Sequence, residues 1–146
     1  MIQDKPLCYA PFIGMYATGY EQYAPCCVAK KDTYENLDPA DYWKSEELQK
    51  IRKDLLAGKW PDACAFCKNK SDKGLKNETW IWDKHMSKVD VELDIQNGNT
   101  TKGPMFLDYR PSNLCNLKCR MCVPNASSQI TKEFQENPEM QKWFKA

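Results

Sequence analysis

The chain has 146 residues, of which 42% are apolar and 28% charged, and its formal net charge is +1. This length suits one globular domain, or one small domain with part of another. A net charge near zero gives no electrostatic basis for binding nucleic acid or an anionic membrane surface. The longest nearly apolar stretch, residues 9–17, is far shorter than the roughly 20 residues of a membrane span. Because the start also lacks the features of a secretory signal, we expect a cytoplasmic protein.

The first half of the chain predicts short strands followed by helices. Residues 1–30 are rich in aromatic side chains and predict short β-elements with a turn near Gly19. Asp38 is a predicted N-cap with Pro39 at the first helical position. Ser45 caps a second segment, 46–57, which ends at Gly58.

The helix predicted over residues 46–57 is amphipathic. Its apolar residues recur at helical spacing, which indicates one buried face; they are Leu48, Ile51, Leu55 and Leu56. On the same pattern, Lys50, Arg52 and Lys53 are expected to stay in solvent.

Polar and alternating segments follow. Residues 68–80 carry four lysines and are predicted to form a solvated loop. Strict alternation over 89–95 predicts a half-buried strand, with a turn at Asn97–Gly98. Residues 105–109 predict another strand that runs into a loop. A final helix is capped by Ser127 or Ser128 and continues toward 140–144.

Eight cysteines dominate the chemistry of the sequence: Cys8, Cys26, Cys27, Cys64, Cys67, Cys115, Cys119 and Cys122. In a secreted protein an even number of cysteines predicts a disulfide framework. Without an export signal, and with five cysteines in two tight clusters, metal ligation or redox chemistry is the better interpretation.

Cys115, Cys119 and Cys122 form a C-x3-C-x2-C loop between the predicted strand and helix. Thiolates are the preferred ligands of iron–sulfur clusters. Three of them hold three irons of a [4Fe–4S] cluster and leave the fourth iron open for chemistry. A structural zinc site needs a fourth ligand, which neither flank supplies nearby.

The segment FLDYRPSNLCNLKCRMC resembles the first strand and cluster loop of the radical S-adenosylmethionine (radical SAM) enzymes. The resemblance implies that Cys115, Cys119 and Cys122 bind the cluster and that SAM chelates its open iron. Reductive cleavage of SAM in that family yields methionine and a 5′-deoxyadenosyl radical. The residue before the last cysteine, which lies near the adenine, is usually aromatic in the family but is Met121 here.

The remaining cysteines form a second constellation of Cys8, Cys26-Cys27 and the C-x2-C pair Cys64 and Cys67. Four thiolates close every corner of a cluster, and they also suit structural zinc, so the residues alone leave both metals open. The segments CYAPF, APCC and IRKDLLAGKWPDACAFC resemble the twitch domain, a shortened SPASM domain with an auxiliary [4Fe–4S] cluster. Spacing does not decide between Cys26 and Cys27 as ligand; we favour Cys26.

These expectations combine into an α+β protein in which a small cysteine-rich iron–sulfur domain precedes the first β/α unit of a partial (β/α) barrel. The predicted regions are a twitch-like domain at 1–78, a connector at 79–104 and the start of the radical SAM core at 105–146. Because only one β/α unit fits after the cluster loop, we expect the chain to be the N-terminal part of a longer enzyme. The expected partners are SAM, an electron donor such as flavodoxin or ferredoxin, and a peptide or small-molecule substrate. The alternative is an iron–sulfur or zinc binding module without catalysis.

Overall fold

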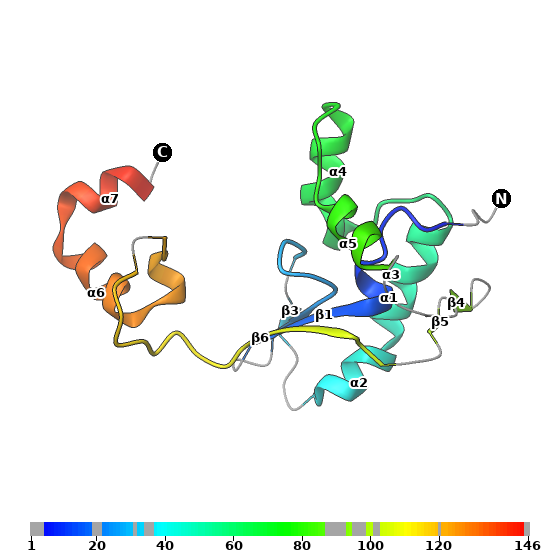
Figure 1. Cartoon of the computed structure of the whole chain (residues 1–146), viewed down its shortest axis with the longest axis horizontal. Coiled ribbons are helices and arrows are strands. Elements are labelled where there is room, and N and C mark those ends of the chain that lie inside the picture. Colours follow the sequence, from blue (N-terminus) through cyan, green and yellow to red (C-terminus); the bar gives the residue numbers. More distant parts are fainter. Residues whose placement is uncertain are drawn as a thin grey trace. The chain divides into compact units, whose positions relative to one another are not determined.

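The structure is a computed structural model with mixed α and β elements, as the sequence predicts (Figure 1). It describes residues 5–18, 22–30, 32–33, 37–86, 93–94, 99–100, 103–119 and 121–144. The chain divides into two compact units, 1–109 and 110–146.

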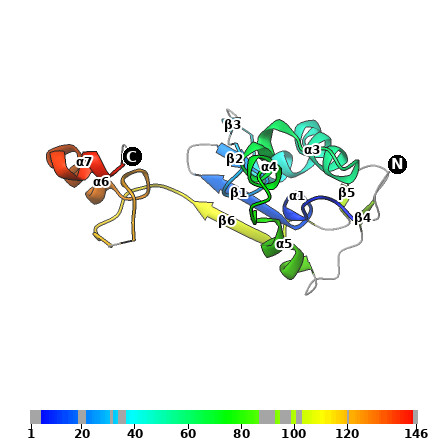
Figure 2. The same ribbon diagram turned by 90° about the horizontal axis from the view of Figure 1, so that it is seen from above.

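The first unit contains a four-stranded sheet with the strand order β3-β2-β1-β6. Its strands are β1 (Gly14–Thr18), β2 (Gln22–Ala24), β3 (Asp32–Thr33) and β6 (Phe106–Arg110). β1 pairs antiparallel with β2, with Tyr16 opposite Ala24, and β2 pairs antiparallel with β3. β1 and β6 lie side by side in both views (Figures 1 and 2).

The early strands and the strand predicted over 105–109 are therefore confirmed, the latter shifted by one residue. The turn expected near Gly19 lies outside the described residues. β6 was expected to open the third region of the chain, whereas here it completes the sheet of the first unit.

Two capped helices follow the sheet strands in the order predicted. α2 (Pro39–Lys44) begins after Asp38, whose carboxylate accepts a hydrogen bond from the Ala40 N–H at 2.7 Å. α3 (Glu46–Leu56) begins after Ser45, whose hydroxyl accepts from the Leu48 N–H at 3.2 Å. Gly58, with φ at 71°, ends α3 in the left-handed conformation that glycine adopts without strain.

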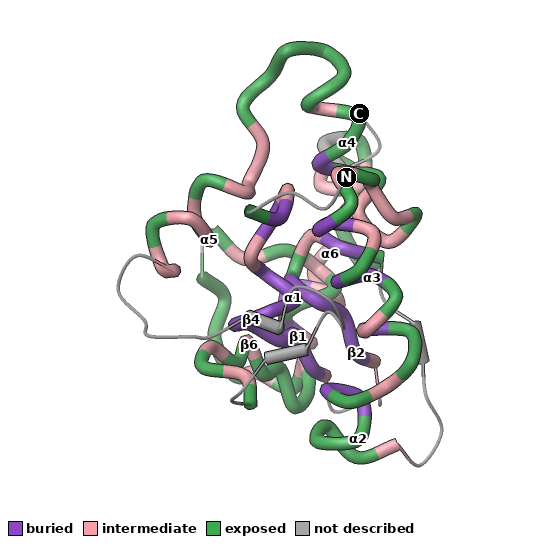
Figure 3. Tube along the Cα trace, turned by 90° about the vertical axis from the view of Figure 1, so that its right-hand side faces the viewer, coloured by how far each residue is buried: buried purple, intermediate pink, exposed green. Residues whose placement is uncertain are grey.

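The core of the first unit lies where α1 (Ala10–Ile13), β1, β2 and α3 meet, and these carry most of the buried segments in Figure 3. The apolar face predicted for α3 is buried as expected. The expectation for Arg52 is wrong, because its side chain is only 2% exposed. Arg52 is held in the core by two contacts: its Nε donates to the Pro11 carbonyl of α1 at 2.8 Å, and its guanidinium lies over the Trp43 ring of α2.

The loop predicted over 68–80 is also wrong in large part. Residues 62–64 form a 3-10 turn, which leads into α4 (Ala65–Asp72). An ion pair between Lys68 and Asp72, one helical turn apart, favours the helix. Gly74, with φ at 65°, ends it, and the Leu75 N–H donates to the Lys70 carbonyl, as expected for a Schellman cap.

The predicted connector at 79–104 contains more structure than one strand. It starts with a helix, α5 (Thr79–Met86), and continues with the paired strands β4 (Leu93–Asp94) and β5 (Asn99–Thr100). β4 overlaps the strand expected over 89–95; the rest of that strand and the turn at 97–98 lie outside the described residues.

The second unit consists of the cysteine loop, a 3-10 turn at Pro124–Ala126 and two helices. α6 (Ser128–Glu136) is capped by Ser127, as one of the two predicted alternatives. The predicted continuous last helix is interrupted at Asn137, and α7 (Pro138–Phe144) begins anew. Pro138 explains the break, since proline has no N–H to continue the helical ladder and disfavours helical geometry in the preceding residue.

Within the part of the chain that the structure describes, no helix is both long enough and apolar enough to cross a membrane.

Candidate metal centres

Four cysteines from distant parts of the chain line one small cavity in the first unit. They are Cys8, Cys26, Cys64 and Cys67. The remaining walls are apolar and include Pro11, Trp60 and Phe66, and the cavity between the side chains has a volume of only about 20 Å³. The structure thus brings together the four residues expected at the second metal site.

Local structure explains why the four side chains converge. Cys8 precedes α1, and Cys26 lies in the turn that follows β2. Cys64 and Cys67 sit on the 3-10 turn and the first turn of α4, so the C-x2-C spacing places them on one side of a helical segment. The backbone N–H of Lys30 donates to the Ala63 carbonyl at 2.9 Å and ties the Cys26 turn to the Cys64 segment.

The thiols are close enough to influence one another electrostatically. Burial is the main cause that raises the pKa of Cys8 far above its usual range, that of Cys26 to about 11 and that of Cys64 to about 12. Burial also raises the pKa of Cys67. A smaller contribution is repulsion between the thiolates, which acts between every pair of the four. Together they hold the unliganded thiols protonated at neutral pH, and a metal must displace those protons.

Backbone N–H groups are already directed at the sulfur atoms. The Ala10 N–H donates to Cys8 Sγ at 3.4 Å. The Val28 and Ala29 N–H groups donate to the Cys26 sulfur and lower its pKa against the effect of burial. Such N–H···S bonds favour thiolate over thiol, and they are one of the means by which proteins tune iron–sulfur clusters.

Cys67 is the cavity cysteine with a charged neighbour. Its thiol donates to the Glu78 carboxylate, with 3.7 Å between Sγ and Oε2. The other carboxylate oxygen of Glu78 accepts from Lys70 Nζ at 2.8 Å. When Cys67 loses its proton on binding a metal, its thiolate and the Glu78 carboxylate are two negative charges side by side. Lys70 is in place to compensate one of them.

Cys26 and Cys27 are adjacent in sequence but differ in placement. Cys26 is 9% exposed and lines the cysteine cavity, whereas Cys27 is exposed. Both contact a second, wider pocket bounded by Trp82, His85 and Phe106. Of the two, Cys26 is therefore the one that lies with Cys8, Cys64 and Cys67 at the cysteine cavity.

The four cavity cysteines are not arranged as the ligands of a single metal ion. Among the described residues, no three His, Cys, Asp or Glu side chains are drawn together as they are around one ion. A zinc ion needs sulfur atoms at about 2.3 Å from a single point. In a [4Fe–4S] cluster each thiolate binds a different iron, so the four sulfurs need not meet at one point.

The C-x3-C-x2-C loop in the second unit is far more open. Cys119 is exposed, and Cys115 and Cys122 are half-buried. Met121 is 94% exposed, so its side chain has little contact with the unit. The Leu117 N–H donates to Cys115 Sγ at 3.4 Å. None of the eight cysteines, all within the described residues, forms a disulfide.

Two serines at the start of α6 hold this loop in place. The Ser128 hydroxyl accepts from the Cys115 N–H at 3.1 Å and donates to the Cys115 carbonyl at 3.2 Å. The fully buried Ser127 donates to the Leu117 carbonyl at 3.2 Å while it caps α6. Sequence reasoning identified both serines only as caps, because a loop-anchoring hydroxyl leaves no periodic signal.

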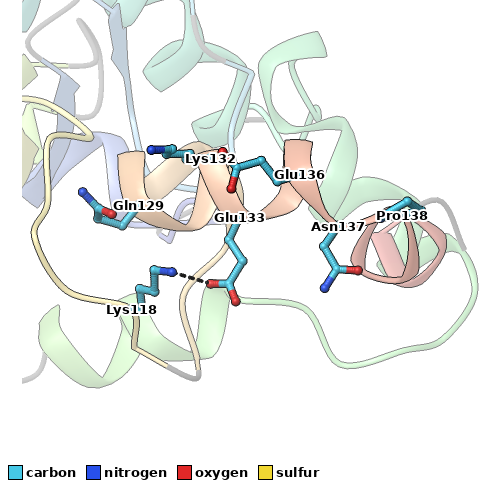
Figure 4. A pocket seen from close by; sticks show the side chains of 7 residues that line it. All are labelled: Lys118, Gln129, Lys132, Glu133, Glu136, Asn137 and Pro138. Atoms are coloured by element: carbon cyan, nitrogen blue, oxygen red, sulfur yellow. Dashed lines mark ion pairs between the residues drawn. The ribbon is translucent and has the colours of Figure 1, made fainter.

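The loop is also fastened by charge. Lys118 Nζ lies 3.3 Å from Glu133 on α6, and this pair forms part of the wall of a polar pocket between the loop and α6 (Figure 4). Both side chains are about half exposed, so the pair stabilises by no more than ~1 kcal/mol.

No family model matches the chain, and no curated protein or solved structure matches it either.

Proposed function

We propose that the chain is part of a radical SAM protein with two [4Fe–4S] clusters. Cys115, Cys119 and Cys122 hold the SAM-binding cluster. The auxiliary cluster occupies the cavity of the first unit. The observation that carries the proposal is the convergence of four thiols, from three separate segments, around one apolar cavity.

The two proposed centres differ in what the protein leaves accessible. Four thiols close the auxiliary site, which suits electron transfer or a structural role. The loop supplies three thiols, and a [4Fe–4S] cluster held by three thiolates would keep one iron open to a ligand. When bound, such a cluster would supply the one electron for the reductive cleavage of SAM to methionine and a 5′-deoxyadenosyl radical.

In this proposal the residues of this chain bind the clusters and orient the loop that carries Cys115, Cys119 and Cys122. Ser127 and Ser128 fix the loop backbone, and Met121 is exposed at the position that would face the adenine. β6, the loop and α6 are proposed as the first β/α unit of a partial barrel, in a cytoplasmic protein. Flavodoxin or ferredoxin would supply electrons, and peptide or small-molecule modification is the proposed reaction class.

Metal analysis tests the proposal. Protein purified without oxygen is expected to be brown and to hold roughly eight irons and eight sulfides, the content of two [4Fe–4S] clusters. Replacing Cys115, Cys119 and Cys122 together by Ala should remove half of the iron and every spectral change caused by SAM. Stoichiometric zinc without labile sulfide would contradict the proposal and favour a zinc module.

A second measurement separates the enzyme from a binding module. The enzyme, once reduced, forms 5′-deoxyadenosine from SAM, and the triple variant does not. A protein with both clusters intact that binds SAM in its complete form and never cleaves it would support the binding module instead.

A further inference from the structure

Arg52 is a buried cation that forms no ion pair with any residue the structure describes. Its Nε donates to the Pro11 carbonyl oxygen at 2.8 Å, and its guanidinium lies 4.3 Å from the centre of the Trp43 ring. Its Nη2 is buried and has no hydrogen-bond partner. No carboxylate in the described part of the chain forms an ion pair with it.

A buried charge of this kind is costly without compensation. Taking a guanidinium out of water is unfavourable unless an opposite charge or a full set of hydrogen bonds replaces the lost hydration. Burial lowers the pKa of Arg52 to about 10, which still leaves it charged at neutral pH. The carbonyl oxygen of Pro11 and the face of Trp43 compensate only part of the charge.

The cysteine cavity is joined to Arg52 through α1. Pro11, whose carbonyl accepts from Arg52, also lines the cavity. Ala10, its neighbour in the same helix, donates its N–H to the sulfur of Cys8. One short helix therefore contacts the buried cation and the cysteine ligand set at the same time.

We propose that Arg52 is the buried counter-charge of the cluster bound by Cys8, Cys26, Cys64 and Cys67. This inference rests on the proposed function. Four thiolates give such a cluster a net negative charge, and reduction makes it more negative. A cation held in the same low-dielectric core stabilises the loaded form over the metal-free form and the reduced form over the oxidised form. Arg52 is thus a positioning and electrostatic residue that sets the reduction potential.

Three substitutions separate the charge of Arg52 from its packing. Arg52→Lys keeps the charge, Arg52→Gln keeps a hydrogen-bond donor without the charge, and Arg52→Met keeps only apolar bulk. Lys53→Gln removes a charge from the next position of α3, which is exposed, and is the matched control. All are made in the full chain with Cys115, Cys119 and Cys122 replaced by Ala, so that only the auxiliary cluster is measured.

Two quantities are measured. The first is the reduction potential, obtained by redox titration, and the second is the difference in thermal unfolding midpoint between loaded and metal-free protein. In Arg52→Gln and Arg52→Met we expect the reduction equilibrium to shift at least tenfold toward the oxidised form, which is about 59 mV for one electron. The stabilisation gained on loading should shrink in the same two variants. Arg52→Lys and Lys53→Gln should retain the parent values.

Several outcomes overturn the inference. An unchanged potential in Arg52→Gln or Arg52→Met, with the cluster still bound, shows that Arg52 only packs. A shift in Arg52→Lys as large as in Arg52→Gln shows that geometry, and not charge, is responsible. If Arg52→Met does not fold, the Lys and Gln variants provide the same comparison. Absence of iron and sulfide from the parent chain contradicts the proposed function itself, before any Arg52 variant is compared.

Discussion

The hydroxyl of Ser128 bridges both backbone polar groups of Cys115, accepting from its N–H at 3.1 Å and donating to its carbonyl at 3.2 Å. The first residue of α6 thereby fixes the first cysteine of the C-x3-C-x2-C loop, although thirteen positions separate them. The loop is otherwise open, with Cys119 and Met121 exposed. Its geometry depends on a few contacts such as the hydrogen bonds of Ser128, and we expect substitutions at these contacts to disturb the loop.

Ser128→Ala is expected to weaken metal retention by the loop. Loss of two hydrogen bonds costs roughly 1–3 kcal/mol at this site, which corresponds to a decrease of about 5- to 150-fold in cluster affinity. The measurement is iron retained against a chelator, together with the spectral change caused by SAM. Ser71→Ala, at an exposed position of α4, is the control and should change neither. Equal retention in the two variants would show that the Ser128 bridge is not needed to hold the metal.

Cys26→Ser and Cys27→Ser should have opposite consequences for the auxiliary cluster. Cys26 is buried at the cavity and accepts backbone hydrogen bonds, whereas Cys27 is exposed. We expect Cys26→Ser to lose about half of the total iron and Cys27→Ser to keep it. The two variants control for each other, since they make the same chemical change one residue apart. Iron loss confined to Cys27→Ser would reverse the assignment.

Alkylation of the metal-free protein should reveal the raised pKa of the cavity thiols. The thiolate is the reactive form, so below its pKa a thiol reacts about tenfold faster for each unit of pH. With a pKa of about 11, Cys26 should still accelerate between pH 9 and pH 10, where an ordinary exposed thiol levels off. Mass spectrometry of peptides measures each site. Cys26 reacting as fast as Cys27 and Cys119 at pH 8 would contradict the burial described here.

Local signals made part of this fold predictable. Asp38, Ser45 and Gly58 mark helix ends through their own backbone chemistry, and each acts as the sequence indicates. Arg52 was mispredicted because periodicity assigns a charged residue to solvent. Its burial depends on the Pro11 carbonyl and the Trp43 ring, which only tertiary structure supplies.

The cysteine sites also combine a part that local sequence signals predict with a part that depends on tertiary structure. Spacing within the chain identified Cys64 and Cys67 as a pair, because two residues between them suffice to place both on one helical turn. Their meeting with Cys8 and Cys26 is a long-range event, which was expected from the number of remaining thiols and from the resemblance and not from any local spacing. The lysine-rich stretch after Cys67 was mistaken for a loop because of its polar composition, although the spacing of Lys68 and Asp72 and the glycine at position 74 are local signals of a helix and its end.

Gly14→Ala should destabilise the first unit through a steric conflict with α5. A Cβ at Gly14 would lie 2.5 Å from two ring atoms of Trp82, so α5 or the start of β1 must shift. Overpacking of this kind costs about 1–3 kcal/mol. Chemical denaturation followed by tryptophan fluorescence measures it. Gly103→Ala, whose Cβ meets no atom within 4 Å, should stay within about 0.5 kcal/mol of the parent chain. The double variant Gly14→Ala/Trp82→Leu should lose less stability than the two single variants lose in sum, because the smaller side chain at position 82 makes room for the new methyl group. Strict additivity of the two substitutions would show that Gly14 and Trp82 do not contact each other.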